Sequence, residues 1–124
     1  MMNAEEFERT AQDVFDSLPG NILRRIENVH IVVEDSPGEQ TLVKTGTTSR
    51  LRLLGLYEGV PLNKRGSNYG VYPVVPDKIT LYRKNIESLA SSDLAVKEKI
   101  REVLIHEIAH YFGMTEEEIR ESGF

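Results

Sequence analysis

The feature that most constrains this chain is the pattern H-E-x-x-H, formed by His106, Glu107 and His110. Residues four apart on an α-helix lie one turn above each other on the same face, so both imidazoles can reach one ion from a rigid backbone. The pattern is typical of a helix that binds zinc through its two histidines and uses the carboxylate between them as a general base. It therefore predicts a local structure and a chemistry together.

A third ligand is predicted in the turn beyond this helix, because a catalytic zinc takes three protein ligands and keeps one position for water. Gly113 can adopt the left-handed conformation that ends a helix and returns the chain toward the face it has left. Glu116 lies ten residues after His106, the offset at which H-E-x-x-H-x-x-G-x-x-H proteins place their third ligand. The offset favours Glu116, and Glu117 remains an alternative.

Two explanations without a metal compete with this prediction. Histidines at this spacing can be a coincidence on an exposed helix face, and Thr115 with Glu118 fits a capping box that accounts for Glu118 by itself. Helical periodicity speaks against coincidence, because the apolar residues fill one arc and the histidines lie roughly opposite its centre. The residues of this arc are Ile100, Leu104, Ile105, Ile108 and Phe112.

Length and composition predict one domain, residues 1–124, with a modest core of its own. The chain has no cysteine, which excludes a disulfide scaffold, a thiolate nucleophile and a cysteine-type zinc finger. Its formal net charge of −5 gives no electrostatic footprint for nucleic acid or an anionic membrane. No signal peptide or transmembrane run is recognisable, so we expect a cytoplasmic protein.

Periodicity and turn signals predict helices at both ends of the chain and strands in the middle. This order indicates an α+β domain, with a small mixed or antiparallel sheet and the long motif helix packed across it. An edge strand beside the two histidines could pair with an extended peptide, although the sequence does not say which strand. The predicted helices start at Asn3 and span 21–27, 85–90, 92–113 and 115–121; the predicted strands span 29–34, 51–57 and 78–83; and residues 36–49 are predicted to be a loop.

Three further groups of residues have open interpretations. The basic connection from Lys64 to Tyr69 is predicted to be either a solvated loop or a substrate flap. Strand alternation points His30 away from the best core face, which predicts a structural or solvent-exposed residue. A second oxyanion donor is expected beside the metal, but the sequence does not choose among the tyrosines, each predicted to pack with its hydroxyl at the surface. The tyrosines are Tyr57, Tyr69, Tyr72, Tyr82 and Tyr111.

Three separated segments resemble the minimal zincin-like family of small bacterial proteins, which are candidate zinc metallopeptidases. The segments are LGLYEGVPL at 54–62, PDKITLYR at 76–83 and HEIAHYFGMTEEEIRESG at 106–123. The resemblance implies a compact α+β zincin fold, with His106 and His110 as metal ligands and Glu107 as general base. The third ligand of the family is usually an aspartate at the position of Glu116, so this chain carries one more methylene there.

These observations lead to two hypotheses of different classes. The first is a cytoplasmic zinc-dependent peptidase that acts on peptides or unfolded polypeptides, in which Glu107 takes a proton from a zinc-activated water. The second is a zinc-stabilised module that binds a peptide strand without hydrolysing it. Replacement of Glu107 by Gln separates them, because only a peptidase would lose turnover while it keeps its metal and fold.

Overall fold

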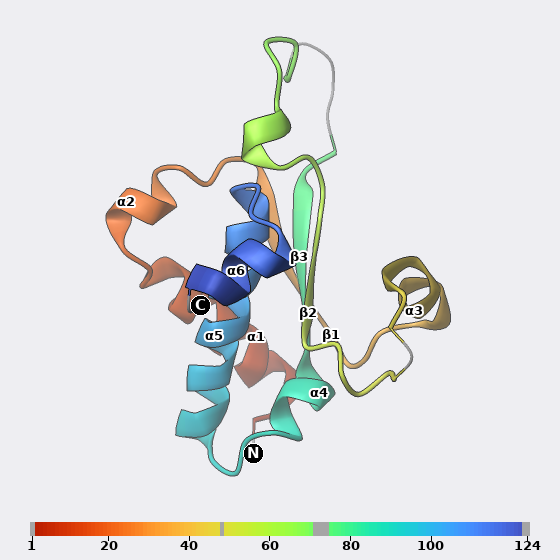
Figure 1. Ribbon diagram of the computed structural model, residues 1–124. Coiled ribbons are helices and arrows are strands. Elements are labelled where there is room, and N and C mark those ends of the chain that lie inside the picture. The colour runs from red at the N-terminus through yellow and green to blue at the C-terminus, as the bar shows by residue number, and fades with distance from the viewer. Residues whose placement is uncertain (1, 48, 71–74, 123–124) are drawn as a thin grey trace.

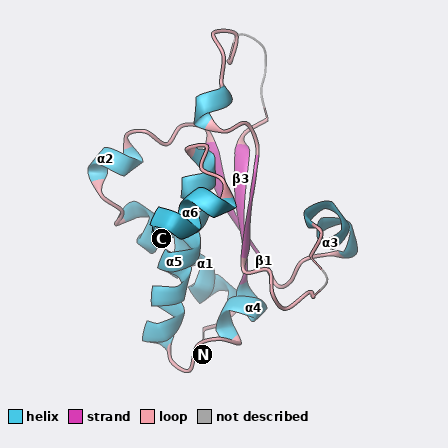
Figure 2. Cartoon of the chain, in the orientation of Figure 1, coloured by secondary structure: helices cyan, strands magenta, loops and turns pink. Residues whose placement is uncertain are grey.

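A three-stranded mixed sheet forms the centre of the molecule (Figures 1 and 2). The computed structural model describes residues 2–47, 49–70 and 75–122. β3 (Asp77–Tyr82) lies between β1 (Val29–Glu34), which runs parallel to it, and β2 (Gly55–Glu58), which runs antiparallel. The strand order β1-β3-β2 leaves β2 at one edge of the sheet. The predicted α+β class with a mixed sheet is confirmed.

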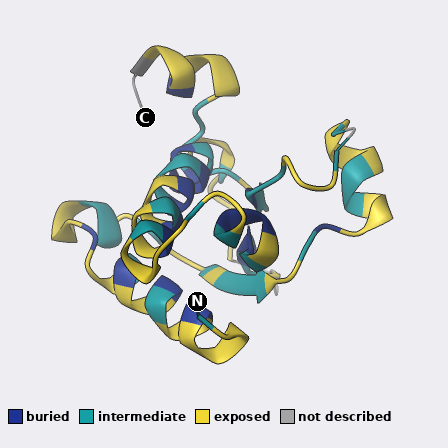
Figure 3. Ribbon diagram, turned by 90° about the horizontal axis from the view of Figure 1, so that it is seen from below, coloured by how far each residue is buried: buried dark blue, intermediate teal, exposed yellow. Residues whose placement is uncertain are grey.

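Two helices supply most of the core that covers this sheet. α1 (Ala4–Asp16) and α5 (Asp93–Tyr111) pack against each other, and α5 also contacts β2 and β3. Each begins where the sequence predicts a cap: the Asn3 side chain accepts from the Glu6 N–H at 2.8 Å, and Ser92 Oγ accepts from the Ala95 N–H at 3.1 Å. Burying the facing apolar stripes of α1 and α5 stabilises both helices (Figure 3).

The core joins the apolar faces of these helices to the inward face of the sheet. β3 is the most buried strand because it has a neighbour on each side and α5 across it. His30 on β1 is exposed, as strand alternation predicts, while Val29, Ile31 and Val33 pack on the core. The fully or nearly fully buried apolar residues of the core are Phe7, Ala11, Val14, Leu18, Ile79, Leu81, Ile86, Val96, Ile100, Val103, Leu104 and Ile108.

Shorter elements complete the fold. They are α2 (Gly20–Leu23), α3 (Glu39–Thr45), the 3₁₀ turn η1 (Leu62–Lys64), α4 (Arg83–Glu87) and α6 (Glu116–Ser122). Across the described parts of the chain, each helix is either too short or too polar to span a bilayer.

The segment from 36 to 54 differs most from the prediction. The predicted loop contains α3, which buries no residue and stands apart from the other helices (Figure 1). With no buried stripe, α3 has no apolar period that the sequence could reveal. The predicted strand 51–57 is shortened to β2, because the buried amide of Asn85 donates to the carbonyls of Arg50 at 2.6 Å and Leu53 at 2.7 Å.

Other differences are shifts of boundaries. β3 and α4 begin earlier than predicted, and α2 ends before the predicted helix 21–27 does. In the connection after η1, the solvated-loop interpretation is wrong at Arg65, whose side chain is only 5% exposed. Tyr72 lies outside the described residues.

Candidate metal centre

The last two turns of α5 place both motif histidines at the wall of a cleft. Their rings lie edge to face with centroids 5.2 Å apart, and their side chains are 35% and 22% exposed. Glu107 points into a more enclosed position and is 7% exposed. The apolar residues Leu104 and Ile108 hold the opposite side of the helix in the core. The apolar residues of α5 thus face the core and the two histidines face the cleft, as the sequence predicts.

A Schellman motif turns the chain back after α5. The Gly113 N–H donates to the His110 carbonyl at 2.9 Å and the Met114 N–H donates to the Ala109 carbonyl at 3.1 Å. Gly113 has φ +95°, and a Cβ there would meet the Asn63 side-chain amide at 2.3 Å. The predicted left-handed turn is therefore present, and its positive φ favours glycine at this position.

This turn brings Glu116 to the histidines. Glu116 Oε1 lies 3.1 Å from His106 Nε2 and 2.6 Å from His110 Nε2. Among the described residues, these three form a group whose ligand atoms all lie within 4.8 Å of one another. Glu117 is exposed and outside this group.

Glu118 has the role that the capping box predicts. Its carboxylate accepts from the Thr115 N–H at 3.2 Å, and its own N–H donates to Thr115 Oγ1 at 3.1 Å. Ile119 is buried and packs α6 onto the protein. The cap and this apolar contact orient the first turn of α6, where Glu116 lies.

The donor set suits a divalent cation. The Met114 carbonyl can only accept, so its 2.9 Å contact with His110 Nδ1 requires a proton on that nitrogen. A neutral ring with its proton on Nδ1 carries a lone pair on Nε2, the nitrogen 2.6 Å from Glu116 Oε1, and this lone pair can bind a metal ion. A backbone carbonyl that orients a histidine in this way is the usual support of a zinc ligand. Two imidazoles and one carboxylate are also a ligand set that zinc accepts.

The pKa values of the two carboxylates at the site are shifted in opposite directions. Partial burial raises the pKa of Glu116, but the hydrogen bonds and charges of His106 and His110 outweigh burial, so its pKa lies below the ordinary value. For Glu107, burial dominates: it raises the pKa above the ordinary value, although both histidines and the Tyr57 backbone N–H act in the opposite direction. Glu116 is thus suited to stay ionised, and Glu107 is suited to exchange a proton.

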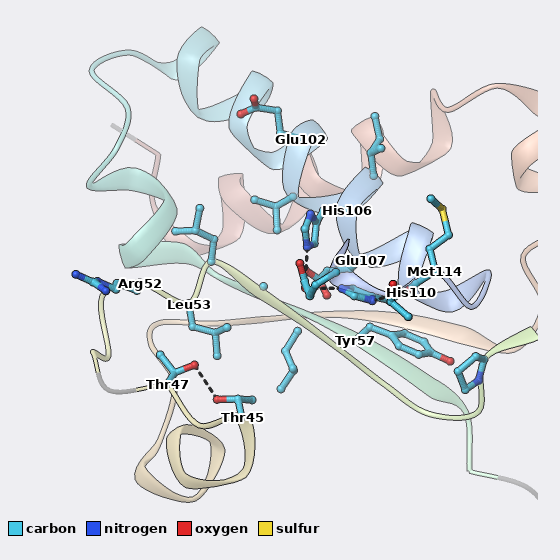
Figure 4. A pocket seen from close by; sticks show the side chains of 18 of the residues that line it. Thr45, Thr47, Arg52, Leu53, Tyr57, Glu102, His106, Glu107, His110 and Met114 are labelled. Carbon is cyan, nitrogen blue, oxygen red and sulfur yellow. Dashed lines mark hydrogen bonds and ion pairs between the residues drawn. The ribbon is translucent and has the colours of Figure 1, made fainter. Parts of the chain in front are cut away.

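An open cleft of about 990 Å³ surrounds these groups. α5 and the turn after it form one side, and β2 with the residues before it forms the other (Figure 4). Gly55 allows the two sides to approach closely, because a Cβ there would lie 2.6 Å from Val103 Cγ1 and 3.4 Å from Glu107 Cγ. The edge strand beside the histidines is therefore β2.

The free edge of β2 carries backbone groups toward the cleft. The Tyr82 N–H donates to the Leu54 carbonyl at 3.0 Å, which directs the amides of Leu54 and, by alternation, of Leu56 toward β3. The N–H and carbonyl groups of Gly55 and Tyr57 then point away from β3. The Tyr57 N–H contacts the Glu107 carboxylate, so this edge reaches the predicted general base.

No described tyrosine has a free hydroxyl directed at the site. The Tyr57 hydroxyl donates to Asp77, Tyr69 accepts from Asn28 Nδ2 at 2.9 Å, and Tyr82 is bonded to Thr41. Tyr111 contradicts the prediction of a surface hydroxyl, because the residue is fully buried and its hydroxyl donates to the Arg25 carbonyl at 3.1 Å. These four residues are held by structural contacts.

Two contributors to the site carry no sequence signal. The Met114 carbonyl is a backbone atom, so its residue type says nothing about the bond to His110. Gly55 is part of the strand predicted at 51–57, yet only the packing distance to Val103 reveals why a side chain is excluded there.

Comparisons with known proteins agree with this architecture. A family model described as "Zincin-like metallopeptidase" matches residues 26–124. The solved structure of a conserved hypothetical protein from "Thermo thermophilus" is similar in fold, with a TM-score of 0.56 and 18% identity over 88% of this chain and 92% of that chain. The search of curated proteins finds no match. The match to the family model covers most of the sequence, and the chain therefore belongs to the zincin-like metallopeptidase family.

Proposed function

We propose that the protein is a small cytoplasmic zinc-dependent peptidase that hydrolyses peptide bonds in peptides or unfolded polypeptides. In this proposal His106, His110 and Glu116 bind the zinc ion and Glu107 is the general base. Family membership supports the class of reaction. The observation that carries the proposal is the convergence of the three ligand atoms beside a buried carboxylate in an open cleft.

The ligand set has a charge suited to hydrolysis. Zinc, when bound, lowers the pKa of a water molecule to about 7 and polarises a carbonyl group. Two neutral imidazoles and one carboxylate leave a net positive charge at the centre. In a neutral ring, the hydrogen bond from His110 Nδ1 to the Met114 carbonyl would hold the proton on Nδ1 and leave the Nε2 lone pair for the ion.

Glu107 would carry the proton in both directions. Its carboxylate accepts a proton from the attacking water as the oxygen–carbon bond forms, and it returns that proton to the departing amine as the carbon–nitrogen bond breaks. A general base works best when its pKa approaches the operating pH, and burial moves the pKa of Glu107 in that direction.

The edge of β2 would hold the substrate. An extended peptide can pair with the outward backbone groups of Gly55 and with the Tyr57 carbonyl, which is the β-augmentation mode of recognition. Main-chain pairing of this kind requires a substrate without secondary structure of its own. The chemistry of the strand edge therefore favours peptides and unfolded segments over folded proteins.

Glu107→Gln tests the proposal. The zinc-loaded wild type and variant would be incubated with a denatured, carboxymethylated polypeptide, and new termini would be detected by mass spectrometry. We expect the variant to keep one equivalent of zinc and to lose about 10²- to 10⁴-fold in cleavage rate. The matched control is Glu98→Gln, which changes an exposed glutamate on the same helix.

Two results would reject peptidase activity. One is equal cleavage by wild type and Glu107→Gln, which would assign the cleavage to a contaminant. The other is a wild type that binds zinc and the polypeptide but leaves it intact, which would favour the zinc-stabilised binding module.

A further inference from the structure

A buried ion pair lies behind the candidate metal centre. Arg65 Nη2 and Asp77 Oδ2 are 2.8 Å apart, and their side chains are 5% and 1% exposed. Removing two charges from water is costly, so a buried pair is weak evidence for added stability and invites another explanation. Neither residue lines the cleft.

The polar atoms of this pair tie three segments together. Arg65 Nε donates to the Val60 carbonyl and Nη1 donates to the Glu27 carbonyl, each at 2.9 Å. Asp77 Oδ1 accepts from the Val60 N–H at 3.1 Å, and Oδ2 also accepts from the Tyr57 hydroxyl. The pair therefore fixes the β2–β3 connection to the start of β3 and to the residues before β1.

Aromatic rings enclose the guanidinium group. Its carbon lies 4.3 Å from the ring centroid of Tyr69 and 5.0 Å from that of Tyr111. Tyr57 and Tyr111 meet edge to face with centroids 6.2 Å apart. The residues Tyr57, Arg65, Tyr69, Asp77 and Tyr111 are called the Arg65 cluster below.

The Arg65 cluster touches both sides of the metal centre. Tyr57 belongs to β2, and its backbone N–H contacts the Glu107 carboxylate. Tyr111 follows His110 directly on α5, and its hydroxyl accepts from the Glu27 N–H at 3.0 Å. The cluster therefore joins the strand beside the general base to the helical turn that carries a ligand.

A third connection passes through η1. Arg65 and Asp77 hold the segment that begins at Val60, and this segment places the Asn63 side chain against Gly113. Gly113 is the pivot of the turn that presents Glu116. Asn63 thus connects the segment held by Arg65 to the turn that presents Glu116.

We infer that Arg65 and Asp77 are positioning residues for the metal centre. By holding Tyr111 and the Asn63 segment together, they fix the last turn of α5, which carries His110, relative to the Gly113 turn, which carries Glu116. The three hydrogen-bonding nitrogens of arginine point in fixed directions, which lysine cannot reproduce. This role rests on the proposed zinc site, and it differs from a general contribution to folding because it predicts a specific loss of zinc affinity.

The experiment compares Arg65→Lys and Asn63→Ala with Arg83→Lys. Arg83 is a matched control, since it forms ion pairs with Asp35 and Glu87 at the opposite end of β3. Zinc dissociation constants would be measured by competition with a chromophoric chelator, well below the unfolding temperature. We expect zinc binding to be about tenfold weaker for Arg65→Lys, about threefold weaker for Asn63→Ala and unchanged for Arg83→Lys. Asn63→Ala still tests the inference if Arg65→Lys fails to fold.

A second readout does not need the metal. Hydrogen exchange of the metal-free proteins would be followed at the amides of residues 113–119 and at those of β3. We expect both test variants to accelerate exchange at 113–119 while β3 stays protected.

The two readouts separate the possible failures. Zinc affinities and local exchange rates equal to those of the wild type would overturn the inference and leave the proposed function intact. A wild type without zinc affinity would reject the proposed zinc chemistry, while the exchange experiment would still decide whether the Arg65 cluster holds the turn.

Discussion

The two sides of the cleft are built from different kinds of chemical group. The helical side, α5 with α6, brings three ionisable side chains to one point. The strand side, β2 with the residues before it, presents apolar side chains and the outward backbone groups of Gly55 and Tyr57. Side chains on a rigid helix suit metal binding and proton transfer, whereas an open backbone edge suits recognition of an extended chain.

The difference teaches that chemistry and recognition can be damaged separately. A change on the helical side should remove metal and turnover together. A change on the strand side should spare the metal and impair the alignment of substrate. The predictions that follow test this separation, beginning with the largest effect.

His110→Ala should abolish stable zinc binding. If three ligands share a total of about 10–16 kcal/mol roughly equally, the loss of one weakens binding about 1000-fold. Elemental analysis after dialysis should find about one zinc per wild-type molecule and almost none in the variant. His30→Ala is the control, since His30 is exposed on β1. Full zinc retention by His110→Ala would show that His110 is not a zinc ligand and that the metal does not bind at the helical side.

Glu116→Gln should weaken zinc binding less, by about 10- to 100-fold, because an amide oxygen replaces a charged ligand while the size of the side chain is kept. Glu117→Gln should have no effect, since Glu117 is exposed and outside the group of converging atoms. Competition titrations with a chelator would rank the two variants. The reverse ranking would assign the third ligand to Glu117.

Gly55→Ala tests the strand side. The new methyl group would meet Val103 Cγ1 at 2.6 Å and the Thr80 carbonyl at 3.2 Å, so β2 must move away from α5. We expect a loss of stability of about 1–3 kcal/mol and about tenfold slower peptide cleavage through misalignment, with zinc affinity unchanged. Gly66→Ala is a matched control because a Cβ there has nothing within 4 Å. Equal loss of zinc and turnover would show that the two sides are not separable.

The contrast between the helical side and the strand side also explains which parts of the site could be predicted from the sequence. Spacing rules concern local geometry, and the convergence of His106, His110 and Glu116 depends only on one helix, one glycine turn and one cap. Each of these has a residue-type signal within a few positions of the motif. The helical side could therefore be predicted residue by residue, together with the α+β fold.

The strand side depends on contacts between residues far apart in the chain. The start of β2 is set by Asn85, and its approach to α5 is set by the absence of a side chain at Gly55. The buried Arg65 pairs with Asp77, which lies 12 residues later in the sequence. An arginine in a glycine-containing segment resembles a solvated loop, so no local pattern distinguishes a buried cation from an exposed one.

The smallest predicted effect is a gain of stability on the helical side. Because burial raises the pKa of Glu107 above 4.5, the folded protein holds the proton more tightly than the unfolded chain does. Stability is therefore highest below the unfolded pKa and falls as pH rises through the folded pKa.

Metal-free Glu107→Gln should then be more stable than the wild type by about 1 kcal/mol at pH about 7.5, as is common for residues kept for function. This gain in stability should disappear near pH about 4. Urea unfolding at both pH values would measure this, and Glu98→Gln, on the exposed surface of the same helix, should show no such gain. A lower free energy of unfolding for Glu107→Gln at the higher pH would mean that the Glu107 carboxylate stabilises the fold. The helical side would then not be a region where stability is lost in favour of chemistry.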